Sequence, residues 1–389
     1  MKIKTVLIAH ASHAVWAVCQ KTPREMIVGD WFSLTAKQIK RFYPKIEVEC
    51  WCPEKIKKNM EFNESGVRYR QFPTTFSPMY GLDFSISMLK ELKKEVKKSE
   101  KEGYKLIFHL HEYHNLHGLL ISTLFKNQNI IAQHHGGSWP LKLVREIKEY
   151  RLFFPAFLLG QLWENRVLKN VKIFYPLSSF EIEYLTKRAP NSKIKFQTMG
   201  IDDYYFDYMD KKLARKKVGW PLNKKILLYL GRINKFKGIP YLLDAMKELP
   251  DIELKIIGWG EQEKYEEETK LRELKNVEFL GPIFDKEKLP YFSAADAFIL
   301  PSAAKEGASV TVMEAMARNL PIVSTDVAGM PLVIKNNQEG LLIKKKNSEE
   351  IVKAVKGILK WKKKNVKKYA ERYRWEKIID DTVKDYEEM

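Results

Sequence analysis

The stretch KILLYLGRINKFKGIPYLLDAMKEL (225–249) decides the fold of this chain. It begins with a short apolar run, passes through a basic turn that contains glycine, and continues into a segment with apolar residues at helical spacing. Those apolar residues are Ile239, Leu242, Leu243, Met246 and Leu249. A strand that leads through a tight turn into an amphipathic helix is the repeating unit of parallel α/β sheets. We therefore expect an α/β fold.

The same alternation of short apolar runs and amphipathic segments continues in both directions. Because 389 residues exceed one ordinary core, we expect two domains. The polar segment MGIDDYYFDYMDKK (199–212) separates two series of runs and is typical of an interdomain connection. The strand-like runs are 5–10, 46–50, 67–72, 104–110, 129–133, 172–177 and 194–199 before it, and 225–231, 254–258, 277–281, 297–301, 321–325 and 340–343 after it.

The overall composition restricts the partners and the compartment. The formal net charge is +19 at pH 7, which favours anionic partners such as nucleic acid, acidic lipid headgroups or phosphorylated small molecules. Cys19, Cys50 and Cys52 fit neither a disulfide framework nor a zinc site, so we expect reduced thiols in a cytoplasmic protein. We expect no secretory signal in MKIKTVLIAH, and no apolar run reaches the roughly 18 residues of a membrane span.

The first chemical feature is GRINKFKG (231–238), which directly follows an apolar strand. Gly231 is predicted to turn the backbone off the strand. Arg232 and Lys237 then lie on a short loop, and Lys237 stands beside Gly238 at the start of a helix. Two cations and a helix N-terminus form an anion site suited to a diphosphate. The alternative, two solvated surface cations, stays open in so basic a chain.

The second feature is PSAAKEGASVTVMEAMA (301–317), which follows the strand AFILP and leads into a helix. A helix that starts near Ser309 offers the free N–H groups of its first turn, including that of Val310, to a phosphate. Glu314 lies in an apolar stretch, where an unpaired carboxylate is costly, and could accept hydrogen bonds from a ribose diol. Glu306, in the loop, could accept hydrogen bonds from sugar hydroxyls. The alternative for Glu314 is an ordinary helix glutamate.

Histidines occur only in the first half of the sequence. His111, His114 and His117 are three apart in HLHEYHNLH (109–117), but no further metal ligand of the usual spacing accompanies them, so we expect no metal site there. QHHGG (133–137) closes an apolar run, and its glycines permit the close approach of a ligand. A histidine at this position is expected to face a cleft between the two domains.

In these motifs the second half of the chain resembles the donor domain of the retaining "group 1" glycosyltransferases of family four. The resemblance rests on a strand followed by GR-x4-KG, on the glycine turn IIGWGE (256–261), on Pro-Ser before Glu-x7-Glu, and on LPIVSTDVAGMPLVI and EGLLI, all in family order. The first half resembles the family more loosely, through QHHGG, LSSFEIEYL and MGID. The resemblance implies a GT-B fold: two Rossmann-like domains whose parallel sheets face a central cleft. The expected domains are 1–200 on the acceptor side, 201–368 on the donor side, and a terminal helix, 369–389, that crosses back.

The resemblance also implies roles for individual residues. Arg232 and Lys237 would hold the donor diphosphate, Glu314 the ribose and Glu306 the transferred sugar. His135 would be the catalytic histidine on the acceptor side, with His134 as the alternative. The donor-binding segment would continue through Gly307, Ala308, Ser309 and Val310. Transfer would proceed with retention and without a metal or cofactor, the donor being UDP- or GDP-linked.

Two departures from the family pattern concern the loops. HASHAVWAV follows the first strand where the family has a pair of glycines, which puts acceptor and phosphate contacts there in doubt. Ser309 replaces a glycine of the family's EGFG, and a positive φ at this position would be strained.

The sequence gives less information about the acceptor and about membrane association. LFFPAFLLGQLW (152–163) follows Lys142, Arg145, Lys148 and Arg151, and apolar residues beside cations are typical of an interfacial helix. The same residues would equally suit packing against a sheet, because periodicity does not distinguish the two. A glycan or lipid-linked acceptor at an anionic membrane surface, with peripheral association, is therefore one of two open interpretations.

Two rival functions also stay open on the sequence. One is a nucleotide-sugar epimerase or hydrolase on the same fold, since a fold does not determine chemistry. The other is a basic nucleic-acid-binding protein. We expect no nucleic-acid partner, because the lysines are scattered and no recognised binding module appears.

Overall fold

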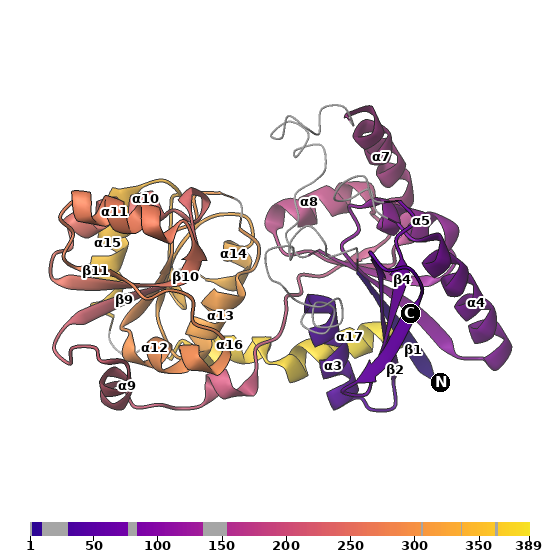
Figure 1. The fold of residues 1–389 in the computed structure, drawn as a ribbon, viewed down its shortest axis with the longest axis horizontal. Helices are drawn as coiled ribbons and strands as arrows, with labels where there is room; N and C mark the ends of the chain where they lie inside the picture. The colour runs from indigo at the N-terminus through magenta and orange to yellow at the C-terminus, as the bar shows by residue number, and fades with distance from the viewer. Residues whose placement is uncertain are drawn as a thin grey trace. The chain divides into compact units, whose positions relative to one another are not determined.

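The computed structural model describes residues 2–9, 30–76, 84–134, 154–304, 306–335, 337–361 and 365–389. Contacts divide the chain into two compact units. Unit 1 comprises Met1–Met199 and Glu376–Met389, and unit 2 comprises Gly200–Trp375. Each unit consists of a β-sheet covered by helices (Figure 1).

Among the described residues, the sheet of unit 1 has eight strands in the order β3-β4-β2-β1-β5-β6-β7-β8. Neighbouring strands are parallel except β3 and β4. The strands are β1 (Ile3–Ala9), β2 (Glu47–Glu54), β3 (Met60–Glu64), β4 (Val67–Pro73), β5 (Lys105–His111), β6 (Asn129–Gln133), β7 (Ile173–Tyr175) and β8 (Lys193–Ile194).

Both faces of this sheet are covered. Val6 and Ile8 of β1 pack into a core with α4 (Ile86–Glu102) and α5 (Leu116–Leu124). On the other face, Ser33 of α3 (Trp31–Phe42) shares a hydrogen bond of 2.7 Å with Tyr69. The other helices among the described residues of this unit are α7 (Phe154–Val167), α8 (Ser179–Arg188) and most of α17 (Trp375–Glu388). Cys50 and Cys52 are buried free thiols on β2, and burial raises their pKa; Cys19 lies outside the described residues.

Helix α17 joins unit 1 through polar contacts made by its last turns. The Tyr386 hydroxyl lies 2.8 Å from Nδ1 of His109, and Tyr175 donates a hydrogen bond of 2.8 Å to Asp385. Lys193 forms an ion pair of 2.6 Å with the same aspartate. The end of the chain is thereby fixed on the sheet of unit 1.

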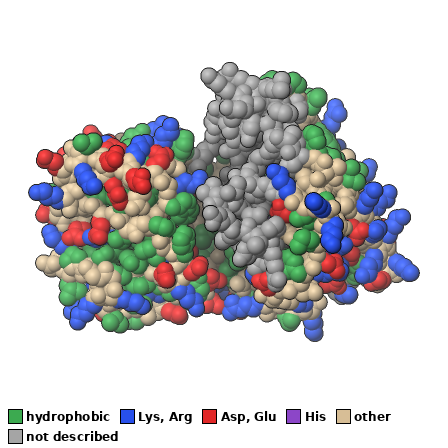
Figure 2. Space-filling view, in the orientation of Figure 1, with side chains coloured by type: hydrophobic (Ala, Val, Ile, Leu, Met, Phe, Trp, Pro, Cys, Tyr) green, Lys and Arg blue, Asp and Glu red, His purple; other side chains and the backbone are tan. Residues whose placement is uncertain are grey.

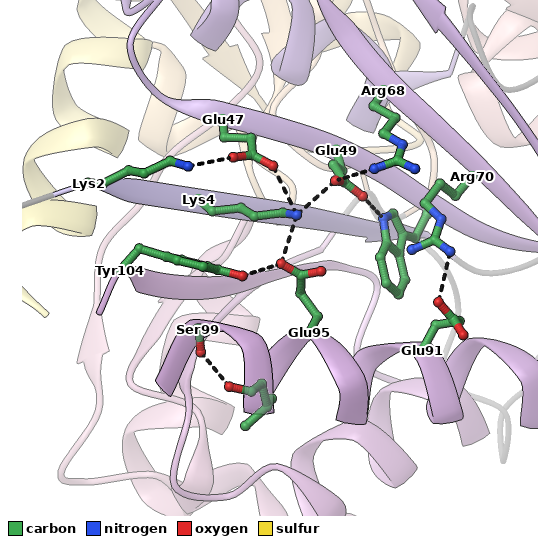
Figure 3. Close-up of polar contacts among 12 residues, drawn as sticks. Lys2, Lys4, Glu47, Glu49, Arg68, Arg70, Glu91, Glu95, Ser99 and Tyr104 are labelled. Atoms are coloured by element: carbon green, nitrogen blue, oxygen red, sulfur yellow. Dashed lines mark hydrogen bonds and ion pairs between the residues drawn. The ribbon is translucent and has the colours of Figure 1, made fainter. Parts of the chain in front are cut away.

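A buried ion network lies at the amino-terminal edge of this sheet (Figure 3). Nζ of Lys4, whose residue is 2% exposed, lies 2.8 Å from a carboxylate oxygen of Glu49 and 2.8 Å from one of Glu95. A third carboxylate oxygen, of Glu47, lies 3.0 Å away. Tyr104 donates a hydrogen bond to Glu95. Removal of one partner from a buried ion pair is strongly destabilising, because it leaves an uncompensated buried charge.

In unit 2 the described strands form a six-stranded parallel sheet in the order β11-β10-β9-β12-β13-β14. Chain order reverses between β9 and β12, as at the switch point of a Rossmann sheet. The strands are β9 (Lys225–Ile233), β10 (Ile252–Gly260), β11 (Val277–Phe279), β12 (Ala297–Leu300), β13 (Ile322–Thr325) and β14 (Gly340–Ile343). The α-helices are α9 (Lys211–Val218), α10 (Ile239–Lys247), α11 (Gln262–Leu271), α12 (Leu289–Ala294), α13 (Val310–Ala317), α14 (Met330–Val333), α15 (Ser348–Ile358) and α16 (Lys367–Ala370).

The strands match the sequence prediction with two exceptions. The run 194–199 was expected to be a strand, but β8 ends at Ile194. Strand β3 was not expected, because it has no apolar run and is half-exposed. It pairs with β4 through a tight turn in which Ser65 and Gly66 have φ of 52° and 75°, the signs required by the favoured two-residue hairpin turn.

None of the helices within the described ranges combines the length and the apolar character required to cross a bilayer.

Candidate active site

The predicted donor residues lie at the switch point of the unit 2 sheet. Strands β9 and β12 are hydrogen-bonded neighbours, with Leu227 opposite Ala297. Their carboxyl ends therefore place the loop after Ile233 beside the loop after Leu300. Ligands of open parallel sheets bind at this position.

The predicted turn at Gly231 is wrong. Strand β9 continues to Ile233, and Gly231 is paired with Gly258 of β10. A Cβ atom on Gly258 would lie 1.8 Å from the carbonyl oxygen of Gly231, so the glycine on β10 permits the close approach of the two strands. The backbone leaves the sheet only after Ile233.

Lys237 and Glu306 join the two loops. Nζ of Lys237 lies 2.5 Å from Oε2 of Glu306, and both side chains are largely buried. The hydroxyl of Ser302 donates a hydrogen bond of 2.8 Å to the same oxygen. Asn234 accepts a hydrogen bond of 2.9 Å from the Lys237 N–H and so fixes the short turn η4 (Lys235–Lys237). An ammonium group has three donors, so Lys237 can bind an anion while it keeps Glu306 in place.

Gly238 allows the two loops to meet. Its φ is 81°, and a Cβ atom there would lie 1.9 Å from the carbonyl oxygen of Pro301. Both the backbone conformation and the contact therefore require glycine at this position. Helix α10 begins at the next residue, Ile239.

Helix α13 begins as predicted, with Ser309 as its N-cap. The φ of Ser309 is −74°, so serine in place of the family's glycine causes no strain. No described side chain caps the helix, and the Ser309 hydroxyl instead shares a hydrogen bond of 2.9 Å with that of Thr311. Gly307 and Ala308 lead from Glu306 to this cap. The first-turn N–H groups, including that of Val310, are therefore left for a ligand.

Glu314 is buried on α13 and is not part of the Lys237 pair. Nζ of Lys288 lies 3.0 Å from Oε1 and 3.1 Å from Oε2 of this carboxylate. Tyr205 also hydrogen-bonds it. Burial raises the pKa of Glu314, and the charge of Lys288 opposes that change only in part. A buried carboxylate paired in this way fits a structural ion pair as well as a ligand contact, so both interpretations of Glu314 stay open.

The sequence prediction missed these two partners. Lys288 ends the short turn η5 (Asp285–Lys288), and Tyr205 lies in η3 (Asp203–Phe206). Neither residue belongs to one of the motifs, and the sequence does not distinguish one lysine from the many others in this chain.

Arg232 lies near the end of β9 with an exposed side chain. Its carbonyl oxygen accepts a hydrogen bond of 2.7 Å from the Tyr229 hydroxyl. Within the described ranges its guanidinium has no hydrogen bond or ion pair, so it is available to an anionic ligand. Figure 2 shows other Lys and Arg side chains interspersed with Asp and Glu over the visible face of unit 2, rather than gathered in one basic stripe.

The predicted catalytic histidine, His135, lies outside the described residues. Its alternative, His134, follows β6 in unit 1, and its Nδ1 lies 3.1 Å from Oε2 of Glu181. The three histidines of HLHEYHNLH do not share one helix: His111 ends β5, His114 lies in the following loop and His117 is on α5. Among the described residues, the set that could hold a metal ion is His114, His134 and Glu181.

Comparison with known proteins supports the family resemblance over unit 2. Residues 210–374, which lie wholly within that unit, match the family model of the group 1 glycosyl transferases. An uncharacterized glycosyltransferase of Methanocaldococcus jannaschii is 29% identical over 214 residues, which are 51% of this chain and 55% of that protein. The matching segments span about half the length of several of the curated relatives.

Solved structures resemble the whole chain. Sucrose-phosphate synthase from Thermosynechococcus elongatus has a TM-score of 0.70 at 18% identity, covering 100% of this chain and 99% of its own. HepE from Anabaena, solved in complex with UDP, has a TM-score of 0.68 at 15% identity, with both chains fully covered at 100%. These likenesses confirm the predicted fold class, an α/β GT-B fold with two Rossmann-like domains.

Proposed function

We propose that this protein is a glycosyltransferase that moves a sugar from a nucleotide-sugar donor bound at the switch point of unit 2. The observation that carries the proposal is the junction of Lys237, Glu306 and Ser302 between the loops that follow β9 and β12. The family match over 210–374 supports it. The UDP in the HepE structure supports a uridine or similar nucleotide.

Each residue of this site has a proposed contact with the donor. Arg232 and Lys237 bind the diphosphate, together with the N–H groups at the start of α13. Glu314 binds the ribose diol, for which it exchanges part of its contact with Lys288. Glu306, held by Lys237 and Ser302, contacts the transferred sugar.

The proposed reaction proceeds with retention of configuration. The acceptor oxygen bonds to the anomeric carbon on the face from which the diphosphate departs, and its proton passes to the departing diphosphate oxygen. Negative charge that develops on the diphosphate is stabilised by Arg232 and Lys237, positioned before the reaction. We propose that these cations, rather than a metal ion, assist departure of the leaving group. His135 remains the proposed catalytic histidine on the acceptor side.

A panel of nucleotide sugars tests this function. Thermal unfolding of the full chain with UDP- and GDP-linked hexoses should give a higher midpoint with at least one donor, since a ligand that binds only the folded state stabilises it. The stabilising donor, incubated with glycan and lipid-linked acceptors, should give a product whose anomeric configuration equals that of the donor by NMR. Release of free or epimerised sugar alone would instead indicate a hydrolase or an epimerase.

We further propose an acceptor at an anionic membrane surface, because α7 presents apolar residues outward. Leu158, Leu159 and Leu162 are 45%, 66% and 55% exposed, whereas Glu164 on the same helix is fully buried. An ordinary surface helix has the opposite arrangement. Phe154, also exposed, extends the stripe by one turn. An apolar stripe of this kind suits the boundary between headgroups and acyl chains.

Co-sedimentation with vesicles tests the membrane proposal. The protein should sediment with anionic vesicles more than with neutral ones, and salt should weaken the binding. Leu158→Asp combined with Leu162→Asp should reduce binding at least roughly tenfold, since two leucine side chains that would be buried in the membrane are lost. The control is Leu213→Asp with Leu271→Asp, two exposed leucines of unit 2, and should bind as wild type. Equal binding of both double variants contradicts the assignment to α7.

A further inference from the structure

The carboxyl-terminal edge of the unit 1 sheet holds a compact group of imidazoles and carboxylates. His114 follows β5, His134 follows β6, and Glu181 is in the first turn of α8. One ligand atom from each of the three lies within 4.8 Å of the others. We call these residues the His114 triad. They come from two loops and the start of a helix, so only the folded sheet brings them together.

The triad is supported by a second layer of polar groups. Oε2 of Glu164 lies 3.1 Å from Nδ1 of His114, and the hydroxyl of Tyr184 donates a hydrogen bond of 2.6 Å to Oε1 of Glu164. Tyr113 donates one of 2.7 Å to Oε1 of Glu181, and the Leu177 N–H donates one of 3.0 Å to Oε2. Metal-binding histidines characteristically donate their other ring N–H to a carboxylate that is itself hydrogen-bonded.

The charges of the group also favour a cation. Glu164 is fully buried and Glu181 is 5% exposed, and among the described residues neither forms an ion pair with a lysine or arginine. Oε2 of a further carboxylate, Glu112, lies 3.6 Å from Nε2 of His134. The two buried carboxylates each lie 3.1 Å from an imidazole nitrogen, Glu164 from His114 and Glu181 from His134. Buried charges are retained where they are paired or bind a metal.

We propose that the His114 triad binds a divalent transition-metal ion of the zinc class. His114 would bind through Nε2, with Nδ1 held by Glu164, and His134 would bind through Nδ1. Glu181 would supply one carboxylate oxygen. Two imidazoles and one carboxylate, with one position left open, suit Zn²⁺. The ion would hold the loop after β5 to the end of β6 and to the start of α8. The proposal is independent of the sugar-transfer chemistry proposed for unit 2.

Direct metal binding tests the proposal. The full chain is stripped with EDTA, freed of chelator, and titrated with Zn²⁺ against a chromophoric competitor. We expect each chain to bind about one Zn²⁺ tightly through the triad. The midpoint of thermal unfolding should be higher when this ion is bound. His114→Gln and Glu181→Gln should each weaken this binding at least roughly tenfold, and Glu164→Gln should do so by roughly ten- to a hundredfold through the orientation of His114.

The control is Glu183→Gln, an exposed carboxylate two positions along α8, which should bind Zn²⁺ as the wild type does. Circular dichroism of the stripped variants shows whether each folds, and His114→Gln carries the test if Glu181→Gln does not. The proposal is overturned if the wild type does not bind Zn²⁺, or if His114→Gln binds it as tightly as the wild type does. The group would then be a buried ion-pair network.

Discussion

Lys237→Ala should lower the rate of sugar transfer at least tenfold and up to roughly a thousandfold, the range for loss of one charged group that stabilises a developing anion. The loss should appear in kcat, because the diphosphate gains charge as the bond to the sugar breaks. The structure adds a second cause, since Nζ of Lys237 lies 2.5 Å from Glu306 and joins the two loops. Steady-state rates with the stabilising donor measure the effect.

Lys235→Ala is the matched control for this prediction. Lys235 belongs to the same short turn and is exposed, but it has no proposed contact with the donor. It should keep a rate within about twofold of the wild type, as expected for a solvated surface cation. Equal rates for Lys237→Ala and the wild type, with both proteins folded, would remove Lys237 from the site.

Lys4→Met should lower the free energy of unfolding by about 3–5 kcal/mol, the usual cost of removing one partner from a buried ion pair. The methionine keeps the apolar stem but removes the ammonium group 2.8 Å from Glu49, which is 1% exposed and keeps, among the described residues, only Trp51 at 2.7 Å and Arg68 at 3.6 Å. Denaturant unfolding followed by circular dichroism measures the loss. Because the chain has two units, the transition to compare is the one that belongs to unit 1.

Lys2→Met is the control for Lys4→Met, because it makes the same change on a neighbouring residue. The Lys2 side chain is 59% exposed and pairs with Glu47 at 3.2 Å, so its removal should cost about 0–1 kcal/mol. A Lys4→Met variant that is as stable as Lys2→Met would mean that the network contributes nothing to folding.

The same network gives the pH dependence of stability a definite sign. Burial alone would raise the pKa of Glu95, but hydrogen bonds from Lys4 and Tyr104 outweigh it and hold the pKa below its usual range. Its contribution to stability is therefore present above the unfolded pKa and is lost as pH falls through the folded pKa. Burial alone would lower the pKa of Lys4, but Glu49 and Glu95 raise it. Its contribution is present below the ordinary lysine pKa of 10.5 and is lost as pH rises through the folded pKa.

The places of the proposed donor residues in the fold were largely predictable, because these residues follow strands within local motifs. Lys237 and Glu306 each stand a few residues after an apolar run, and parallel strands bring such positions to one edge of a sheet. Pattern alone did not reveal which strands are neighbours, so the ion pair between these residues was not predicted. Gly231 was assigned to a turn because a glycine after an apolar run usually ends a strand, whereas here the strand continues.

The unit 1 cluster could not be predicted for a different reason. Glu164 and Glu181 lie 50 and 47 residues beyond His114 and His134, in helices whose patterns give no sign that these carboxylates are buried. The spacing of three within HLHEYHNLH is compatible with one helix, but a strand, a loop and a helix divide these residues. Only the tertiary fold brings His114 to His134.

The central claim is that a nucleoside diphosphate binds at the switch point of unit 2, and calorimetric titration tests it most directly. UDP and GDP are titrated in EDTA into the full-length wild type, Lys237→Ala and Lys235→Ala. We expect at least one of the two nucleotides to bind to the wild type without added metal, to bind equally to Lys235→Ala, and to bind at least roughly tenfold more weakly to Lys237→Ala. Failure of both to bind to the wild type, or equal affinity for the wild type and Lys237→Ala, would contradict it.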